Sequence, residues 1–461
     1  MSAYTPDFLS LLPPAAAIVL SLWSRRVLPA LGAGIVTGVL VYTGGNVPAA
    51  VGALFSLFYD LLTTAWILKT LAFAVLVGSV MELMRRSGGI DGFVHLLQHR
   101  LSLVRSRRSA LLLVFLTGVV IFIESSITAL IAGAVGRPLA ARFGFSREKL
   151  AYVCDSTAAP VCSLILINGW GALLLGLIAT QIQAGLVSGD AVAVLMESVA
   201  YNYYAMTALA VTLAVIWFDW DIGPMRRVRS MPPAMEEADG GRQSASLMLI
   251  PLAVMVGGVF FFLWWTGEGN FFKGSGSSAV FYTMLLTLAV MAGQYRLQVG
   301  MPWKTYAGAA LRGAAALLPI VAVLLLAFGI GKVIGMVGTG SWLGGFMDAD
   351  TPRGWLAASV FLVASVMAFA TGTSWGTFSI MLPIAVAVGD AAGAPAPLLI
   401  GAAVSGGVFG DHCSPISDTT IISSLAAGCD HIDHVRTQMP YALLSGVIAL
   451  GMFAAAGFYG R

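Results

Sequence analysis

Charged side chains are scarce in this sequence. Lys, Arg, Asp and Glu together make up 10% of 461 residues, whereas a soluble domain carries roughly 25%. The net charge of +3 is small, and the basic residues cluster between apolar runs, which sets membrane orientation and does not indicate nucleic-acid binding. The four cysteines show no zinc or haem spacing. No phosphate-loop motif occurs, so nothing indicates an ATP-driven pump.

Apolar residues are correspondingly abundant, at 58% of the chain. Apolar runs of about 20 residues recur from end to end, which is the length that an α-helix needs to cross a bilayer. The 53 glycines fit close helix packing and interrupted helices. We therefore expect an all-α polytopic membrane protein surrounded by a lipid bilayer.

The most informative stretch is residues 410–422, which is rich in carboxylates and hydroxyls although apolar runs flank it on both sides. Hydrocarbon does not solvate such groups, so they must face the protein interior, a water-filled cavity or a bound ion. Pro415 removes a backbone donor and interrupts helical hydrogen bonding. The stretch predicts a broken helix at membrane depth that holds a coupling ion. The alternative is a polar loop outside the membrane.

Three further interruptions accompany this stretch. Residues 124–128 lie between two short apolar arms and predict the tip of a re-entrant hairpin, or of a span followed by one, whose second arm ends near Pro138. Residues 371–377 predict a second hydroxyl-rich tip. The apolar run 150–178 is interrupted at 155–160 and again at 168–169. Residues 429–438 are expected to form a polar loop.

The second half of the chain repeats the order of the first, with a span, a hydroxyl-rich tip and a broken apolar run in each. The loop before the first tip is basic, whereas the matching loop at 338–353 is nearly free of Lys and Arg, so the two halves should have opposite orientations. This is the plan of inverted repeats, each with a re-entrant hairpin and a broken helix. The predicted divisions are N-terminal helices (1–63), the first inverted repeat (64–218), a cytoplasmic linker (219–246), connecting or scaffold helices (247–312) and the second inverted repeat (313–461).

The candidate site residues are those whose oxygens meet at the tips and breaks, because sodium prefers hard oxygen ligands. The predicted ion- or proton-binding residues are Asp155, Asp411, Ser414, Ser417, Asp418 and Thr419, with Asp411 and Asp155 as the main Na+ ligands. The predicted tip and substrate residues are Glu124, Ser125, Ser126, Thr128, Thr373, Ser374 and Thr377. A carboxylate that binds either a sodium ion or a proton gives antiport by competition. For each carboxylate the alternative role is the capping of a broken helix end.

Three more residues have two open roles each. His412 could titrate near neutral pH, although a structural hydrogen bond is the commoner role for a lone histidine. Asn168 could line a pocket or serve helix packing. Lys332 either extends to the membrane surface or forms a salt bridge with a carboxylate in the core.

Residues 410–420, which run Gly-Asp-His-Cys-Ser-Pro-Ile-Ser-Asp-Thr-Thr, closely resemble the signature of the NhaC family of sodium/proton antiporters, and so do residues 371–377. The resemblance implies a multi-pass protein of the cell inner membrane that uses Na+ and H+ as coupling ions and no other cofactor. Members of the wider ion-transporter superfamily have inverted repeats and often dimerise through a scaffold part, which leaves a homodimer open here.

We therefore predict a sodium/proton antiporter that works by alternating access. The main alternative is a Na+- or H+-coupled symporter or exchanger of a small organic solute, either an organic anion or an amino acid. A passive channel is disfavoured because two closable tips suit occlusion better than conduction. A membrane enzyme is disfavoured because sequence neighbours on a broken helix rarely form a catalytic triad.

Overall fold

The structure is a computed structural model of the chain. It describes residues 4–24, 26–99, 104–122, 124–165, 167–228, 244–269, 274–339, 342 and 353–459. Most of the predicted linker (229–243) and most of the predicted external loop before the second tip (343–350) lie outside the described residues.

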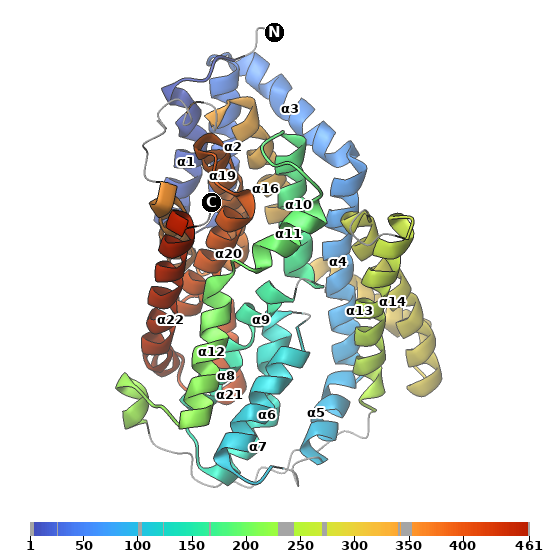
Figure 1. Cartoon of the computed structure of the whole chain (residues 1–461). Helices are drawn as coiled ribbons and strands as arrows, with labels where there is room; N and C mark the ends of the chain where they lie inside the picture. The colour runs from blue at the N-terminus through green and yellow to red at the C-terminus, as the bar shows by residue number, and fades with distance from the viewer. Residues whose placement is uncertain are drawn as a thin grey trace.

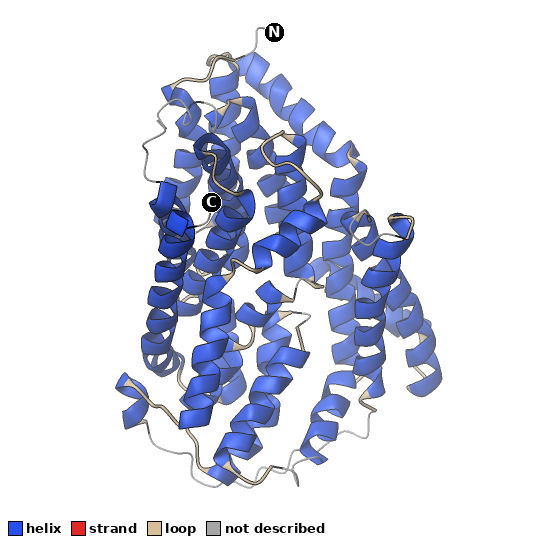
Figure 2. Ribbon diagram, in the orientation of Figure 1, coloured by secondary structure: helices blue, strands red, loops and turns tan. Residues whose placement is uncertain are grey.

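All regular elements among these residues are helical, and Figure 2 shows helices joined by short loops. The α-helices of the first half are α1 (Leu12–Ser24), α2 (Val27–Tyr42), α3 (Val47–Thr63), α4 (Ala65–Arg86), α5 (Gly89–His99), α6 (Arg107–Val120), α7 (Ser125–Phe143), α8 (Arg147–Ser156), α9 (Ala159–Leu164), α10 (Gly169–Gln183), α11 (Ala191–Val199) and α12 (Tyr203–Phe218). Those of the second half are α13 (Ser246–Thr266), α14 (Gly276–Gln298), α15 (Trp303–Ala316), α16 (Leu318–Met336), α18 (Leu356–Thr371), α19 (Ser374–Ala392), α20 (Ala396–Cys413), α21 (Asp418–Ala427) and α22 (His431–Tyr459).

Seven helices within the described ranges are long and apolar enough to cross a membrane, or up to eight if the bent pair α15–α16 counts as one span. Since no strand occurs in the same ranges, the predicted all-α polytopic class is confirmed.

Both predicted broken helices are interrupted where the sequence indicates. The first run ends α8 at Ser156, contains the short α9 and resumes as α10 at Gly169. The second ends α20 at Cys413 and resumes as α21 at Asp418. The cause is local: Ser414 is extended (φ −80°, ψ 129°), as a residue before proline prefers, and Pro415 has no N–H to donate.

Two helix pairs, α6–α7 and α18–α19, reach the middle of the molecule from opposite ends. α6 and α7 lie in the lower half of Figure 1 and α19 in the upper half. α21 packs against α7, whereas α20 packs against α18 and α19, so the second broken helix contacts both pairs. The first broken helix does the same, with α8 against α7 and α10 against α19. This arrangement supports inverted repeats and re-entrant hairpins, which stay predictions.

Two boundaries differ from the sequence-based expectation. α7 continues through Pro138 to Phe143, where a loop was expected. Arg137 in this turn donates to the carbonyl oxygens of Leu425 and Ala426 on α21, so a neighbouring helix holds the segment in place. The expected polar loop 429–438 is wrong for most of its length, because α22 already begins at His431.

The remaining helices frame this centre. α13 and α14 pair with each other, and α14 and α15 pack on α4. α1 and α2 form an antiparallel pair whose connection meets the first turn of α19. A Cβ on Gly376 would lie 2.3 Å from the Val27 side chain, so only glycine permits this approach. The α1–α2 connection is thereby brought to the middle of the molecule.

Candidate functional site: a polar pocket between the helix tips

Asp411 occupies the last turn of α20, next to the break, and is buried. Its Oδ2 accepts a hydrogen bond of 2.5 Å from the Ser374 hydroxyl, at the start of α19. Its Oδ1 has no hydrogen-bond partner among the residues that the structure describes. A buried carboxylate oxygen without a partner is costly in an apolar interior, so this oxygen is available for a bound cation or proton.

The glycines of α20 explain why Asp411 meets Ser374. A Cβ on Gly410 would lie 2.0 Å from the Ser365 carbonyl oxygen of α18, and one on Gly407 would lie 2.4 Å from the Phe378 ring of α19. Without these side chains, α20 packs against the backbone of the second helix pair. The carboxylate therefore reaches the tip of that pair.

The start of α21 supplies more oxygens. The hydroxyls of Ser417 and Thr419 lie 3.0 Å apart, and both residues are buried. Asp418 is exposed, and its Oδ1 accepts the N–H of Thr419 at 2.8 Å. Ser414 instead donates to the carbonyl oxygen of Phe369 at 2.7 Å and fastens the break to α18. This part of the site thus combines two carboxylates with two neighbouring hydroxyls.

The first tip presents a carboxylate of its own. Glu124 is half-buried and caps α7, since its Oε2 accepts the N–H of Ile127 at 2.9 Å, while the Ser125 hydroxyl donates to its Oε1 at 3.3 Å. Thr128 donates back to the carbonyl oxygens of Ile121 and Glu124, so its hydroxyl is used inside the hairpin.

The threonine hydroxyls of the second tip also bond to backbone groups within their own tip. The Thr373 hydroxyl accepts the N–H of Gly376 at 3.5 Å and caps α19. The Thr377 hydroxyl donates to the Thr373 carbonyl oxygen at 3.0 Å and does not line the pocket.

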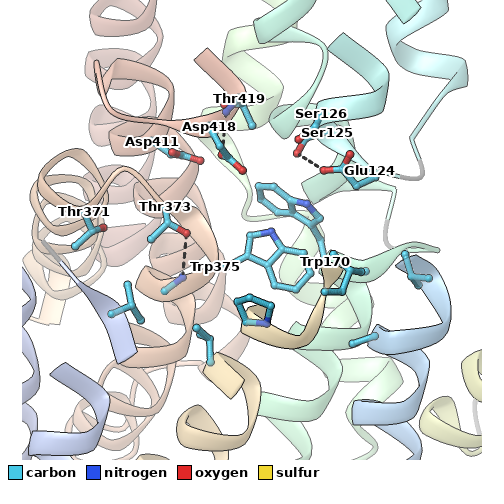
Figure 3. Close-up of a pocket in the computed structure, with 18 of the residues that line it drawn as sticks. Glu124, Ser125, Ser126, Trp170, Thr371, Thr373, Trp375, Asp411, Asp418 and Thr419 are labelled. Atoms are coloured by element: carbon cyan, nitrogen blue, oxygen red, sulfur yellow. Dashed lines mark hydrogen bonds between the residues drawn. The ribbon is translucent and has the colours of Figure 1, made fainter. Parts of the chain in front are cut away.

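A cavity of about 870 Å³ joins these parts (Figure 3). Its polar and aromatic lining residues are Arg26, Glu124, Ser125, Ser126, Trp170, Thr371, Thr373, Trp375, Asp411, Asp418 and Thr419. The cavity therefore brings together both predicted tips and the break of the second broken helix. It also includes Arg26, which the sequence-based reasoning did not single out.

Two tryptophans form one wall of this pocket. Trp170 begins α10 and Trp375 begins α19, and their ring centroids lie 6.1 Å apart in an edge-to-face arrangement. In Figure 3 the indoles lie below the space between the Asp411–Asp418 side and the Glu124 side. The pocket thus has a polar part and an aromatic part.

Asp155 does not line the pocket but belongs to a second, fully buried polar cluster. Its Oδ2 accepts a hydrogen bond of 2.8 Å from the Gln438 amide and lies 3.4 Å from Nε2 of His434 and 3.8 Å from Nε2 of His412. The Tyr204 hydroxyl lies 2.7 Å from Nδ1 of His412. The structure therefore brings Asp155 beside His412, the residue next to Asp411, so the two broken helices meet at their breaks.

Sequence-based reasoning missed three members of this cluster. Tyr204 is on α12, and His434 and Gln438 are on α22, in a segment that was assigned to a loop. The available signal was weak: two polar side chains four residues apart, one helical turn, at the start of an apolar run.

Asn168 and Lys332 have structural contacts. Asn168 caps α10 by accepting the N–H groups of Trp170 and Gly171, and its amide donates to the Phe122 carbonyl oxygen at 2.8 Å, which ties α10 to the first tip. Lys332 does not line the pocket and pairs with Asp60 of α3 at 3.0 Å, in a contact that is about half exposed.

Comparisons with known proteins agree with this arrangement. Residues 161–458 match the sequence model of the Na+/H+ antiporter family. An uncharacterized protein of Haemophilus influenzae is 34% identical over 94% of this chain and 88% of its own. The malate-2H(+)/Na(+)-lactate antiporter of Bacillus subtilis is 32% identical over 40% of each chain. The YdaH transporter of Alcanivorax borkumensis has a similar fold, with a TM-score of 0.61 at 12% identity over 90% of each chain.

Broken helices around a polar pocket in a multi-pass membrane protein define a secondary transporter of the antiporter type, and the related proteins are transporters rather than enzymes. This chain belongs to the Na+/H+ antiporter family. The resemblance of residues 371–377 and 410–420 to that family is thereby confirmed.

Proposed function

We propose that the protein exchanges Na+ for H+ across the bacterial inner membrane by alternating access. The observation that carries the proposal is the unpartnered Oδ1 of the buried Asp411, at the break between α20 and α21. The hydroxyls of Ser374, Ser417 and Thr419 and the carboxylate of Asp418 surround this break with the oxygen ligands that a sodium ion prefers.

The exchange follows from competition for the same oxygens. A sodium ion and a proton cannot both occupy a carboxylate oxygen, so binding of one displaces the other. Asp155 is the matching carboxylate of the first broken helix and is the second proposed binding residue for cation or proton. Its Oδ1 also has no hydrogen-bond partner within the described ranges.

The two helix pairs support alternating access. The tips at Glu124 and Thr373 approach the pocket from opposite halves of the molecule. Withdrawal of one tip would open the pocket to one side while the other tip keeps it closed.

A transport assay tests the proposal. The purified full chain is reconstituted into vesicles with an internal pH dye, and sodium, lithium or potassium is added outside. Sodium-driven alkalinisation is expected for the wild type, and Asp411→Asn should abolish it, because the amide neither binds sodium as a carboxylate does nor exchanges a proton. Retained exchange in a folded Asp411→Asn protein would remove Asp411 from the mechanism.

The size of the pocket favours a second candidate function. A volume of about 870 Å³ falls in the range of pockets for organic ligands, about 300–1,000 Å³, whereas a water molecule occupies only about 30 Å³. Coupled transport of a small organic solute therefore fits the same site. The malate-2H(+)/Na(+)-lactate antiporter among the relatives is consistent with this candidate. An organic-solute gradient that drives sodium or proton movement in the same vesicles would support it.

A further inference from the structure

The charged side chains that line the pocket do not neutralise one another. They are the carboxylates of Glu124, Asp411 and Asp418 and the guanidinium of Arg26. Within the described residues, none of the four side chains forms an ion pair. An unpaired charge at membrane depth is costly and normally marks a pathway or binding site. Asp411 is the buried member of this group, and together the four residues offer both signs of charge to whatever the pocket binds.

Arg26 is available for the negative charge. It precedes α2, at the connection of the α1–α2 pair, and it is an exposed residue that lines the pocket. In the described part of the chain, the hydrogen bonds of Arg26 join its backbone N–H and its carbonyl oxygen to the hydroxyl of Ser24. A guanidinium binds a carboxylate through two parallel hydrogen bonds.

The helix N-termini around the pocket are poorer candidates for an anion. At least one N–H group in the first turn of each of α7, α10, α19 and α21 already bonds to a side chain, that of Glu124, Asn168, Thr373 and Asp418, respectively. Glu124 and Asp418 are carboxylates, which offset the positive end of the helix dipole. Arg26 is therefore the group best suited to hold an anionic group in this pocket.

The two aspartates of the pocket suit a positive group. Asp411 and Asp418 lie beside the aromatic wall of Trp170 and Trp375 (Figure 3). Carboxylates attract an ammonium group, and the face of an indole ring adds a cation–π attraction. The cavity of about 870 Å³ also has room for an organic body.

We infer that the pocket binds an organic solute that carries both a carboxylate and an ammonium group, that is, an amino-acid zwitterion. Arg26 holds its carboxylate, and the Asp411–Asp418 side holds its ammonium group. The inference rests on the proposed function insofar as the same two carboxylates bind the coupling ion. It assigns the N-terminal helix pair a role in substrate binding.

Isothermal titration of the purified full chain tests this inference in buffer that contains sodium. The probes are the standard amino acids, each with its amine counterpart, which lacks the carboxylate, and its acid counterpart, which lacks the ammonium group. At least one amino acid should bind 10-fold or more tightly than both of its counterparts. If no amino acid binds, or if an acid counterpart binds as tightly as its amino acid, the inference is overturned.

A variant of Arg26 makes the assignment specific. Arg26→Gln should weaken binding of that amino acid by 10-fold or more and leave the affinity for its amine counterpart within about twofold. Arg86→Gln serves as the matched control, because Arg86 is an exposed arginine at the end of α4 that does not line the pocket. Unchanged amino-acid affinity in Arg26→Gln would refute the role of Arg26.

The sodium-driven pH change, measured without amino acids, separates this inference from the proposed function. Wild-type exchange without amino-acid binding would sink the inference alone. Amino-acid binding without any cation-driven pH change would sink sodium/proton exchange and leave the amino-acid site in place. Retained affinity of Arg26→Gln for the amine counterpart, which lacks the carboxylate, reports that this variant is folded.

Discussion

Gln438 of α22 connects the two broken helices, and its removal should destabilise the protein measurably. Its amide donates to Oδ2 of Asp155 on α8 at 2.8 Å and to the carbonyl oxygen of His412 on α20 at 2.6 Å. All three residues are buried. Gln438→Leu keeps most of the side-chain volume and deletes both hydrogen bonds.

The expected loss follows from the two groups left behind. A hydrogen bond to a charged group contributes about 1.5–3 kcal/mol, and a buried carbonyl without its partner costs about 1–3 kcal/mol. Because Oε1 of Gln438 itself has no hydrogen-bond partner in the described part of the chain, its removal offsets about 1 kcal/mol. The net loss is about 1.5–5 kcal/mol. An unfolding entropy of about 2.1 cal/mol/K per residue makes 1 kcal/mol worth about 1 °C in a chain of 461 residues, so the unfolding temperature should fall by about 1.5–5 °C.

Heating the detergent-purified protein and following the folded fraction by size-exclusion fluorescence measures this shift. Gln181→Leu is the matched control, since Gln181 is equally buried and its amide makes one long hydrogen bond of 3.5 Å to the Leu177 carbonyl oxygen. The control should unfold within about 1 °C of the wild type. Equal unfolding temperatures for Gln438→Leu and the wild type would refute the claim that this amide joins the two broken helices.

Two further predictions concern the ion pairs and the pocket. Lys149→Met should cost about 2–3 kcal/mol, because the fully buried ammonium donates to two carboxylates at 2.6 and 2.7 Å. Lys332→Met should cost no more than about 1 kcal/mol, since its ion pair is about half exposed, so the two variants should separate clearly in the same thermal assay. Ser374→Ala should raise the sodium concentration for half-maximal exchange by roughly 10-fold through loss of the 2.5 Å hydrogen bond to Asp411. An unchanged sodium dependence would show that this hydroxyl does not orient the carboxylate.

The sequence by itself determined the class of the protein and the positions of its helix breaks. Long apolar runs with few charges dictate membrane helices, because hydrocarbon leaves backbone groups no partner other than one another. Proline and clustered polar side chains interrupt these runs at Asp155–Pro160 and at Asp411–Pro415, and the structure breaks both helices there. Such breaks depend on interactions between residues that are close together in the sequence, so the sequence alone is enough to predict them.

Only the tertiary structure decided which side chains meet. Asp155 and Asp411 were both expected at one site, yet Asp411 faces the pocket while Asp155 lies among His412, His434 and Gln438. These contacts join helices that are far apart in the chain, so they depend on packing that no local pattern encodes.

The same holds for Arg26, which carries no local signal of function and reaches the pocket because Gly376 lets the α1–α2 connection approach α19. Pro138 is the converse case. The proline alone predicts the end of a helix, but α7 continues through it, and Arg137 beside it bonds to the carbonyl oxygens of α21. Local chemistry fixed where this chain bends and breaks, and the packing of distant helices decided which charges share a cavity.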